Sequence, residues 1–393
     1  MEEVLRAFGP MPGGPCLPSV VVMETDGVPN GTYDRHTPLA GPGPVQEGTS
    51  MYAVRLHAFG PAENLRYERI AAPVPGQGQV RVGVRVAGVH FIETMWRAGG
   101  TVGPHPPPRP PVVLGGEVAG VVTALGPGVD DRWLGRRVVG RLSSYGGYAE
   151  QAVVGIDALH HIPDGMTADT AVAMITTGAT TLGVLDSADA GHGDVALVTS
   201  AAGGIGALLV QALRRRGVTV VGVAGGAEKV RRVASLGADV AVDYRDPHWP
   251  DAVRDALEGR VIGVVFDGVG GAAGRQAFDL LGPGGRFLLH GWSSGTPTRI
   301  TTDDIIERAA TVVWAIGPQL LRRAGTMREL RSRALRAAAD GVLEPLFTRY
   351  PLDRAGDAHA DLENRRTTGK VVLVPQPSER DATDEGGGGE AAT

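Results

Sequence analysis

The sequence predicts an α/β protein in which a six-stranded parallel sheet domain is joined to a mostly β domain. Strands and helical stretches alternate from about residue 171 onward, and short strands punctuated by Gly and Pro come before them. Repeated strand-helix-strand units imply a parallel sheet with right-handed crossovers. The six strands are expected at residues 195–199, 218–223, 240–242, 261–266, 286–290 and 312–316, and the helices between the first five at 206–216, 228–236, 250–258 and 273–281.

Residues 51 to about 170 have the pattern of half-buried strands. Polar and apolar residues alternate over residues 79–86, and further short strands are expected at 118–122 and 137–139. After Pro318 a helical stretch leads to apolar segments at 342–345 and 370–374, which have no sheet of their own. We therefore expect the C-terminal segment to return to the first β domain. The predicted domains are a β domain made of 50–171 and 318–375, and the parallel sheet domain at 172–317.

Both ends of the chain are predicted to be disordered. Residues 1–49 are rich in Gly and Pro without a clear period, and residues 376–393 are polar with four consecutive glycines. The N-terminus lacks a basic segment followed by an apolar one, so it does not resemble a secretory signal. The cytoplasm is the expected location.

Composition narrows the function classes. Of the 393 residues, 42% are hydrophobic and 21% charged, and the net charge of -5 gives no electrostatic footprint for nucleic acid or an anionic membrane. No uninterrupted apolar run approaches the ~20 residues that span a membrane. The single cysteine, Cys16, excludes an intrachain disulfide and a zinc site made of several cysteines.

The first predicted strand of the parallel sheet runs directly into a turn rich in small residues. This turn has the sequence Ser-Ala-Ala-Gly-Gly-Ile-Gly over residues 200–206, and a helix is expected after it. Small residues let the backbone approach a pyrophosphate, and a helix N-terminus supplies free N–H donors. An ordinary tight turn is the alternative, but the strand before and the helix after favour a dinucleotide site. The candidate residues are Ala201, Ala202, Gly203, Gly204, Ile205 and Gly206.

The end of the second strand favours NADPH over NADH. An NAD site usually has Asp or Glu there, which binds the ribose 2′-hydroxyl. Residues 221–226 contain no acid, and Lys229 follows. A pocket without an acid and with a nearby cation suits a 2′-phosphate. Arg231 and Arg232 are interpreted as a solvated helix face.

Four segments resemble the quinone oxidoreductase (zeta-crystallin-like) branch of the medium-chain dehydrogenase/reductase superfamily. They are GVHFIETMWRAG at 88–99, GGEVAGVV at 115–122, AAGGIG at 201–206 and RTTGKVVLVP at 366–375. The resemblance implies a Rossmann domain inserted into a GroES-like β domain, with the nicotinamide in the cleft between them. It also implies hydride transfer from NADPH to a quinone or an α,β-unsaturated carbonyl, and a homodimer.

The resemblance also implies further cofactor-binding residues, each of which could instead be a loop residue without a ligand contact. These residues are Thr177, Tyr244, Val269, Gly270, Trp292, Ser293, Ala315, Ile316 and Lys370.

The chain departs from its relatives at the proposed catalytic positions. Zinc-dependent relatives have Cys where His90 stands and Gly-His-Glu where this chain has Gly-Gly-Glu at 115–117. We therefore predict a zinc-free enzyme, since His90 and Glu117 alone would rarely hold a metal.

The quinone branch has Asn in place of His90 and Tyr in place of Met95. His90 either donates a proton to the reduced substrate or only makes hydrogen bonds, as Asn would. Met95 and Trp96 make the predicted pocket more apolar, and loss of the Tyr hydroxyl slightly favours quinones. A non-catalytic NADPH-binding scaffold or regulatory protein with the same fold is the alternative function.

Overall fold

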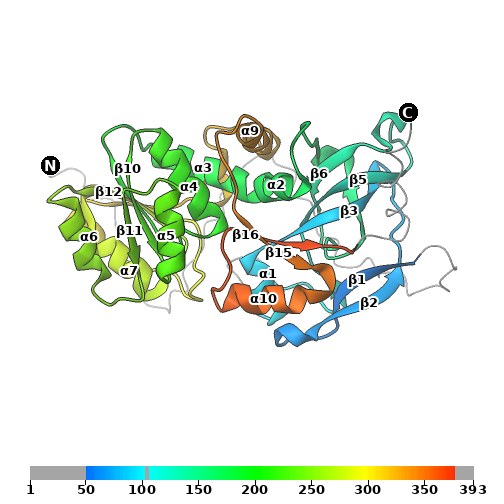
Figure 1. The fold of residues 1–393 in the computed structure, drawn as a ribbon, viewed down its shortest axis with the longest axis horizontal. Coiled ribbons are helices and arrows are strands. Elements are labelled where there is room, and N and C mark those ends of the chain that lie inside the picture. The colour runs from blue at the N-terminus through cyan, green and yellow to red at the C-terminus, as the bar shows by residue number, and fades with distance from the viewer. Residues whose placement is uncertain (1–49, 102–105, 377–393) are drawn as a thin grey trace, which may run out of the picture. The chain divides into compact units, whose positions relative to one another are not determined.

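The computed structural model describes residues 50–101 and 106–376. Both segments predicted to be disordered, apart from residue 376, lie outside the described residues. The described residues belong to one compact unit that begins at Gln46. Its N-terminal strands and its C-terminal strands lie side by side, and the parallel sheet is formed by the middle of the chain (Figure 1).

The middle of the chain forms the predicted six-stranded sheet, with every neighbouring pair parallel. The strand order is β11-β10-β9-β12-β13-β14, so the order reverses between β9 and β12. In open α/β sheets a ligand crevice forms at this reversal, beyond the carboxyl ends of the strands. The strands are β9 (Val195–Val198), β10 (Thr219–Ala224), β11 (Val240–Asp243), β12 (Ile262–Asp267), β13 (Leu281–Leu289) and β14 (Thr311–Trp314).

Helices α4 (Gly204–Arg215), α5 (Ala227–Ser235), α6 (Trp249–Leu257), α7 (Gly271–Asp279) and α8 (Thr302–Arg308) connect these strands. Amphipathic spacing explains their position. In α4, for example, Leu208, Leu209 and Leu213 are buried against the sheet, while Arg214 and Arg215 are exposed.

The C-terminal segment joins the first β domain, as predicted. Strand β16 (Lys370–Val374) pairs antiparallel with β3 (Gln79–Val89), and β15 (Phe347–Pro351) pairs parallel with β16. The larger sheet continues through β5 (Glu117–Leu125), β6 (Arg137–Arg141) and β8 (Leu159–His161), with β7 (Gln151–Gly155) on β3. A smaller sheet contains β1 (Ser50–Leu56), β2 (Leu65–Ala71) and β4 (Val112–Val113). Two helices belong to this domain, α1 (Phe91–Arg97) and α10 (Ala355–Glu363).

The structure differs from the sequence pattern at two places. The apolar segment at 342–345 is irregular chain, and β15 begins only at Phe347. Leu343 is buried in the core instead, and Pro345 lacks the N–H that a sheet ladder needs. The helix expected to reach Leu281 ends at Asp279, because Leu281 already pairs with Ile262 in the sheet.

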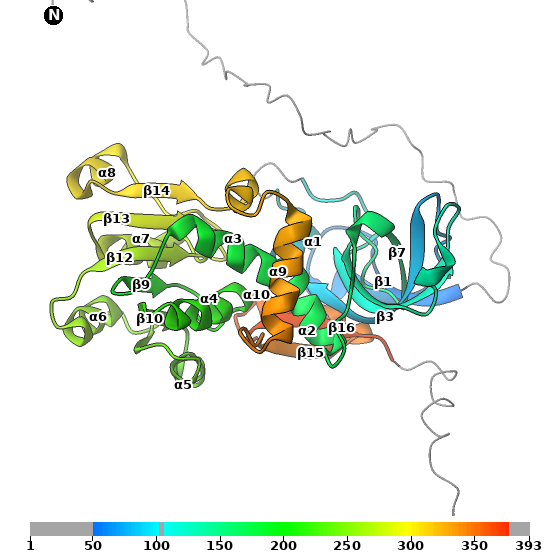
Figure 2. The same cartoon turned by 90° about the horizontal axis from the view of Figure 1, so that it is seen from above.

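A continuous helical run, Ala168–Ala188, connects the two domains. It consists of α2 (Ala168–Ala173), a π-helical turn (Met174–Gly178) and α3 (Ala179–Ala188), and the predicted boundary at 171/172 falls within it. By length and composition the run could cross a membrane, but 72% of its apolar window is buried inside the protein. Helix α9 (Met327–Ala339) packs across this run (Figure 2). The run therefore has the burial of a core helix.

Candidate functional site

A cavity of about 690 Å³ lies where the carboxyl ends of the parallel strands meet the β domain. This volume is within the usual ~300–1,000 Å³ range of ligand pockets. Both domains supply its walls. We call one part the turn end, lined by the turn at 202–206 with Lys229, Tyr244 and Arg365, and the other the lysine end, lined by His90, Phe91, Met95 and the side chain of Lys370.

The Gly-rich turn has the close packing that a phosphate-binding turn requires. Gly203 is the N-cap of α4, and a Cβ on Gly206 would lie only 2.2 Å from the carbonyl oxygen of Ser200. Only glycine therefore fits at 206. Five of the six predicted turn residues line the cavity. Ala201 does not line the cavity: its methyl group is fully buried and its N–H donates to Val223 at 3.0 Å.

Positive charge gathers at the turn end. Lys229 Nζ donates to the carbonyl oxygen of Arg365 at 2.6 Å, and Arg365 Nη1 donates to the Tyr244 hydroxyl at 3.1 Å. Burial lowers the pKa of Lys229, and the charges of Arg245 and Arg365 lower it further. In the described part of the chain, Lys229 has no carboxylate within ion-pair distance. Lys229 and the nearby Arg245 and Arg365 therefore form a cluster of cations that suits a phosphate dianion.

Arg365 is a site residue that sequence reasoning missed. It follows α10 in a left-handed conformation (φ 57°) and comes from the C-terminal segment, 136 residues after Lys229. The sequence did not indicate Arg365, because its place in the cavity depends on the path of the C-terminal segment. Arg231 and Arg232 do not line the cavity, in agreement with their interpretation as a helix face.

Buried Asp267, at the end of β12, shapes the neighbouring loops. Its Oδ1 accepts hydrogen bonds from Thr199 Oγ1 at 2.9 Å and from the N–H groups of Val269 and Gly270 at 3.0 and 3.2 Å. Of the residues predicted to bind the cofactor, Val269, Trp292 and Ser293 line the cavity, but Gly270 does not. Its N–H is directed to Asp267, and it serves instead as the N-cap of α7.

At the end of β14, alternate residues face the cavity. Trp314 and Ile316 line it, whereas the predicted Ala315 is fully buried and its N–H donates to Leu289 at 2.8 Å. Successive side chains in extended chain point to opposite faces, which explains the difference. Trp314 was missed, although this alternation indicates it. Its ring lies 5.2 Å from that of Trp292.

Helix α1 presents one face to the cavity. Phe91, Ile92 and Met95 line it, consistent with i, i+3 and i+4 spacing. Trp96 does not, which corrects its assignment as a pocket residue: its ring packs edge-on against Tyr145, 5.4 Å between centroids.

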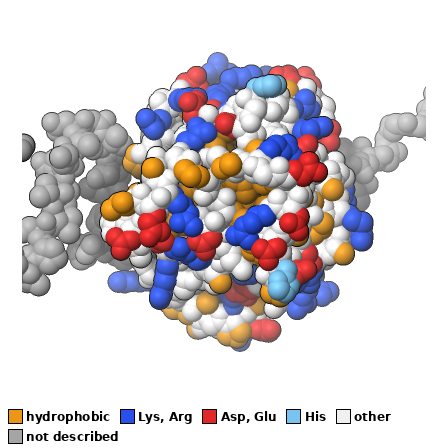
Figure 3. Space-filling view, turned by 90° about the vertical axis from the view of Figure 1, so that its left-hand side faces the viewer, with side chains coloured by type: hydrophobic (Ala, Val, Ile, Leu, Met, Phe, Trp, Pro, Cys, Tyr) orange, Lys and Arg blue, Asp and Glu red, His pale blue; other side chains and the backbone are white. Residues whose placement is uncertain are grey.

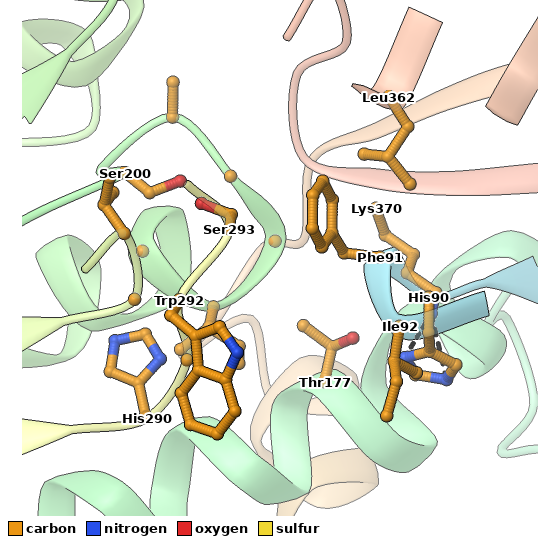
Figure 4. A pocket seen from close by; sticks show the side chains of 18 of the residues that line it. His90, Phe91, Ile92, Thr177, Ser200, His290, Trp292, Ser293, Leu362 and Lys370 are labelled. Atoms are coloured by element: carbon orange, nitrogen blue, oxygen red, sulfur yellow. Dashed lines mark hydrogen bonds between the residues drawn. The ribbon is translucent and has the colours of Figure 1, made fainter. Parts of the chain in front are cut away.

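His90, Glu117 and Lys370 meet at the lysine end. Glu117 Oε1 lies 2.6 Å from Lys370 Nζ and 3.1 Å from His90 Nε2, and Glu117 is fully buried. Burial by itself would raise the pKa of Glu117, but the positive charges of His90 and Lys370 outweigh it and hold that pKa well below its usual range. Figure 4 shows Lys370 running down beside Phe91 to the His90 ring. Glu117 is therefore a carboxylate whose charge is balanced inside the protein.

A second buried network fixes the start of α1. Glu93 accepts hydrogen bonds from the backbone N–H of His90 at 2.8 Å and from the Tyr148 hydroxyl at 2.7 Å. The same hydroxyl lies 3.0 Å from His359 Nε2. Burial, aided by the charge of Arg97, lowers the pKa of His359 to about 3. These contacts fix the backbone of His90 at the N-terminus of α1.

The described residues contain no group of three or more His, Cys, Asp or Glu side chains that could hold a metal ion. His90 and Glu117 do meet, but the Lys370 ammonium already contacts the carboxylate oxygen that faces His90. The residues present do not fit a zinc ion.

Comparisons with known proteins agree with this architecture. Family models described as the alcohol dehydrogenase GroES-like domain and as zinc-binding dehydrogenase match residues 76–164 and 204–333. A quinone oxidoreductase of Pseudomonas aeruginosa is 31% identical, over 82% of this chain and 99% of its own length. A 2-haloacrylate reductase of Burkholderia is 30% identical, over 83% of this chain and 99% of its own length.

Solved structures give the same result. The Escherichia coli quinone oxidoreductase in complex with NADPH has a TM-score of 0.74 at 28% identity, covering 82% of this chain and 100% of that one. The mycobacterial protein Rv1454c in complex with NADPH has a TM-score of 0.73 at 32% identity, covering 83% and 100%. The chain belongs to the quinone oxidoreductase branch of the medium-chain dehydrogenase/reductase superfamily.

Proposed function

We propose that this chain is an NADPH-dependent oxidoreductase that reduces a quinone or an α,β-unsaturated carbonyl without zinc. The observation that carries the proposal is the cavity itself. It joins a turn suited to phosphate and a cluster of cations to an end where His90 and Lys370 line the cavity and contact the buried Glu117 carboxylate.

The turn end fits NADPH. The N-terminus of α4 and the glycine backbone of the turn suit the pyrophosphate, while Lys229 and Arg365 suit the 2′-phosphate. NADPH supplies a hydride to the acceptor when bound. Two similar proteins are described as NADPH complexes, which supports the same cofactor here.

The chain's own residues orient the acceptor and exclude water. Phe91 and Met95 at the lysine end, with Trp314 and Ile316 elsewhere in the cavity, give apolar walls that suit a flat, unsaturated acceptor. The hydride chemistry itself belongs to the cofactor, so the protein needs mainly to position the reactants and control protons. Relatives described as a quinone oxidoreductase and a 2-haloacrylate reductase support both acceptor classes.

We also propose that the reaction does not use zinc. It is supported by the position of Lys370, whose ammonium occupies the place beside Glu117 and His90 that a cation would take. Metal analysis of the purified chain tests it. We expect far less than one zinc per chain, and a stoichiometric amount would contradict the proposal.

An acceptor panel tests the function. We expect NADPH oxidation, followed by absorbance, to depend on an added quinone or enone and to be faster than NADH oxidation. Cofactor binding without turnover for the whole panel would instead support the alternative, a non-catalytic scaffold.

We also propose that the chain is cytoplasmic and forms a homodimer. The dimer is supported by β14, which is an edge strand of the parallel sheet in the described part of the chain, and by Ile306, which is 76% exposed. Figure 3 shows one end of the molecule with acidic and basic side chains interspersed, which gives no support to a nucleic-acid partner. Light scattering should give twice the chain mass, and a monomer at micromolar concentration would contradict the dimer.

A further inference from the structure

Lys370 is a buried cation at the reactive end of the cavity. It begins β16 directly after Gly369, and its backbone N–H donates to Leu346 at 2.8 Å. The residue is only 4% exposed and yet lines the cavity. Within the described residues, Glu117 is the carboxylate paired with its Nζ, at 2.6 Å. An ammonium has three N–H donors, so one ion pair leaves donors for a ligand.

The contact between Lys370 and His90 is not an ordinary hydrogen bond. Nζ lies 3.2 Å from both Nδ1 and Nε2 of the ring. A point in the ring plane at equal distance from both nitrogens would collide with ring carbons, so Nζ lies over the ring face. His90 Nε2 is directed to Glu117 instead, at 3.1 Å. His90 therefore helps to hold the carboxylate, and its ring lies directly against the ammonium.

The surroundings leave the ammonium as the best-placed acid. The cavity residues Val89, Phe91, Met95 and Val371 carry no exchangeable side-chain proton, and the hydroxyl of Thr177, which also lines the cavity, is a weaker acid than an ammonium. When an acceptor carbonyl receives a hydride in a dry site, negative charge develops on its oxygen and needs a donor. His90 has Nε2 committed to Glu117, whereas Lys370 has unused N–H groups.

We propose that Lys370 is a catalytic residue whose ammonium donates a proton to the carbonyl oxygen of the acceptor, and that Glu117 and His90 are its positioning residues. This inference rests on the proposed function. It changes one sequence-based assignment, because Lys370 acts on the acceptor rather than binding the cofactor. Of the two roles left open for His90, it selects hydrogen bonding over proton donation.

Atoms and electrons balance in the proposed step. The hydride carries an electron pair from NADPH to the acceptor, whose π bond breaks, and NADPH becomes NADP+. The Nζ–H bond of Lys370 breaks and an O–H bond forms on the acceptor. The neutral amine then takes a proton from water. The sum is one acceptor, one NADPH and one proton giving the reduced acceptor and NADP+.

Three variants test the proposal. Lys370→Arg keeps the positive charge but removes the acid, because a guanidinium does not deprotonate in proteins. The double variant Lys370→Met with Glu117→Gln removes both partners of the ion pair, so that no unpaired charge is left buried if Lys370→Met alone fails to fold. Lys229→Met is the matched control, a cation of the same cavity at the turn end.

We expect Lys370→Arg and the double variant to lower kcat about 100-fold, the usual contribution of a positioned acid. The solvent deuterium isotope effect on kcat should change in both, while the Kd for NADPH, measured by fluorescence, changes little. Lys229→Met should show the opposite pattern, a raised Kd for NADPH with an unchanged isotope effect.

A binding measurement without turnover gives an independent readout. 4-Nitrophenol, whose phenolate absorbs visible light, stands in for the anionic oxygen of a half-reduced acceptor. We expect the wild type and Lys370→Arg to favour bound phenolate over phenol, and the double variant to lose that preference. Equal preference in all three proteins would overturn the proposal.

The outcomes separate the two proposals. If the wild type reduces no acceptor, the proposed function fails, and the nitrophenol result still decides whether Lys370 stabilises an anion. If the wild type is active and Lys370→Arg keeps its kcat and isotope effect, the function stands and the inference fails. If loss of Lys370 weakens NADPH binding as much as it lowers kcat, Lys370 is a cofactor-binding residue and the inference fails.

Discussion

The turn end of the cavity is made largely by one continuous stretch of chain, whereas the lysine end is assembled from segments far apart in the sequence. Residues 202–206 follow one another from β9 into α4. His90, Glu117 and Lys370 come from the end of β3, the start of β5 and the start of β16. The turn end therefore depends on local backbone geometry, and the lysine end depends on strand pairing in the β domain, which brings three distant segments together around a buried charge.

The largest expected effect comes from Gly206→Ala at the turn end. The new Cβ would lie 2.2 Å from the Ser200 carbonyl oxygen, so the turn must open. Strain of about 3 kcal/mol corresponds to roughly 100-fold weaker NADPH binding. The control is Gly263→Ala, in β12 of the same sheet, where a Cβ meets nothing within 4 Å. Equal Kd values for the two variants, by calorimetry, would show that the turn does not depend on glycine at 206.

Lys229→Met should have the next largest effect. Loss of one charge-assisted hydrogen bond to phosphate, about 2 kcal/mol, corresponds to roughly 30-fold weaker binding of NADPH. NADH lacks the 2′-phosphate, so its affinity should stay the same. Calorimetry with both cofactors checks this, and a parallel loss of NADH affinity would refute the role of Lys229.

These two predictions concern the part of the site that sequence patterns found. The Gly-rich turn was predicted because strand, turn and helix are adjacent, and six parallel strands followed from their alternation with helices. Ala201 was assigned as part of the Gly-rich turn, and Gly270 and Ala315 by the family resemblance, but none of the three lines the cavity. The motif identifies the loop, and the local turn geometry decides which side chain faces the ligand.

The lysine end was only partly predictable. His90 and Met95 were recognised as departures from the family pattern, but the ion pair of Glu117 and Lys370 joins residues 253 positions apart and depends on β16 pairing with β3. The domain boundaries drawn from the sequence stay predictions, because a single helical run crosses one of them.

Trp314→Ala should moderately weaken acceptor binding. The side chain is 44% exposed and lines the cavity, so its removal should cost acceptor binding about 1 kcal/mol and raise the KM for the acceptor about fivefold. Leu134→Ala, exposed in the β domain and away from the cavity, is the control. A raised Kd for NADPH with an unchanged acceptor KM would place Trp314 on the cofactor side.

His359→Gln should change stability rather than ligand binding at either end, because His359 belongs to the buried network that fixes the start of α1. The pKa of His359 is lowered from 6.5 to about 3, so the unfolded chain binds its proton more readily than the folded chain does. Stability is therefore fully present above about pH 6.5 and falls as the pH drops toward 3, by about 1.4 kcal/mol per unit within that window. Denaturant unfolding from pH 6.5 to 4 should show a shallower slope for His359→Gln. Identical slopes would mean that His359 is protonated in the folded state.

The most direct test of the account is the rate of NADPH oxidation by the full chain with and without a quinone. We expect oxidation that requires the quinone, proceeds without added zinc and is faster with NADPH than with NADH. NADPH that binds but is not oxidised with any quinone or enone would contradict the account and leave the cavity as a binding site alone.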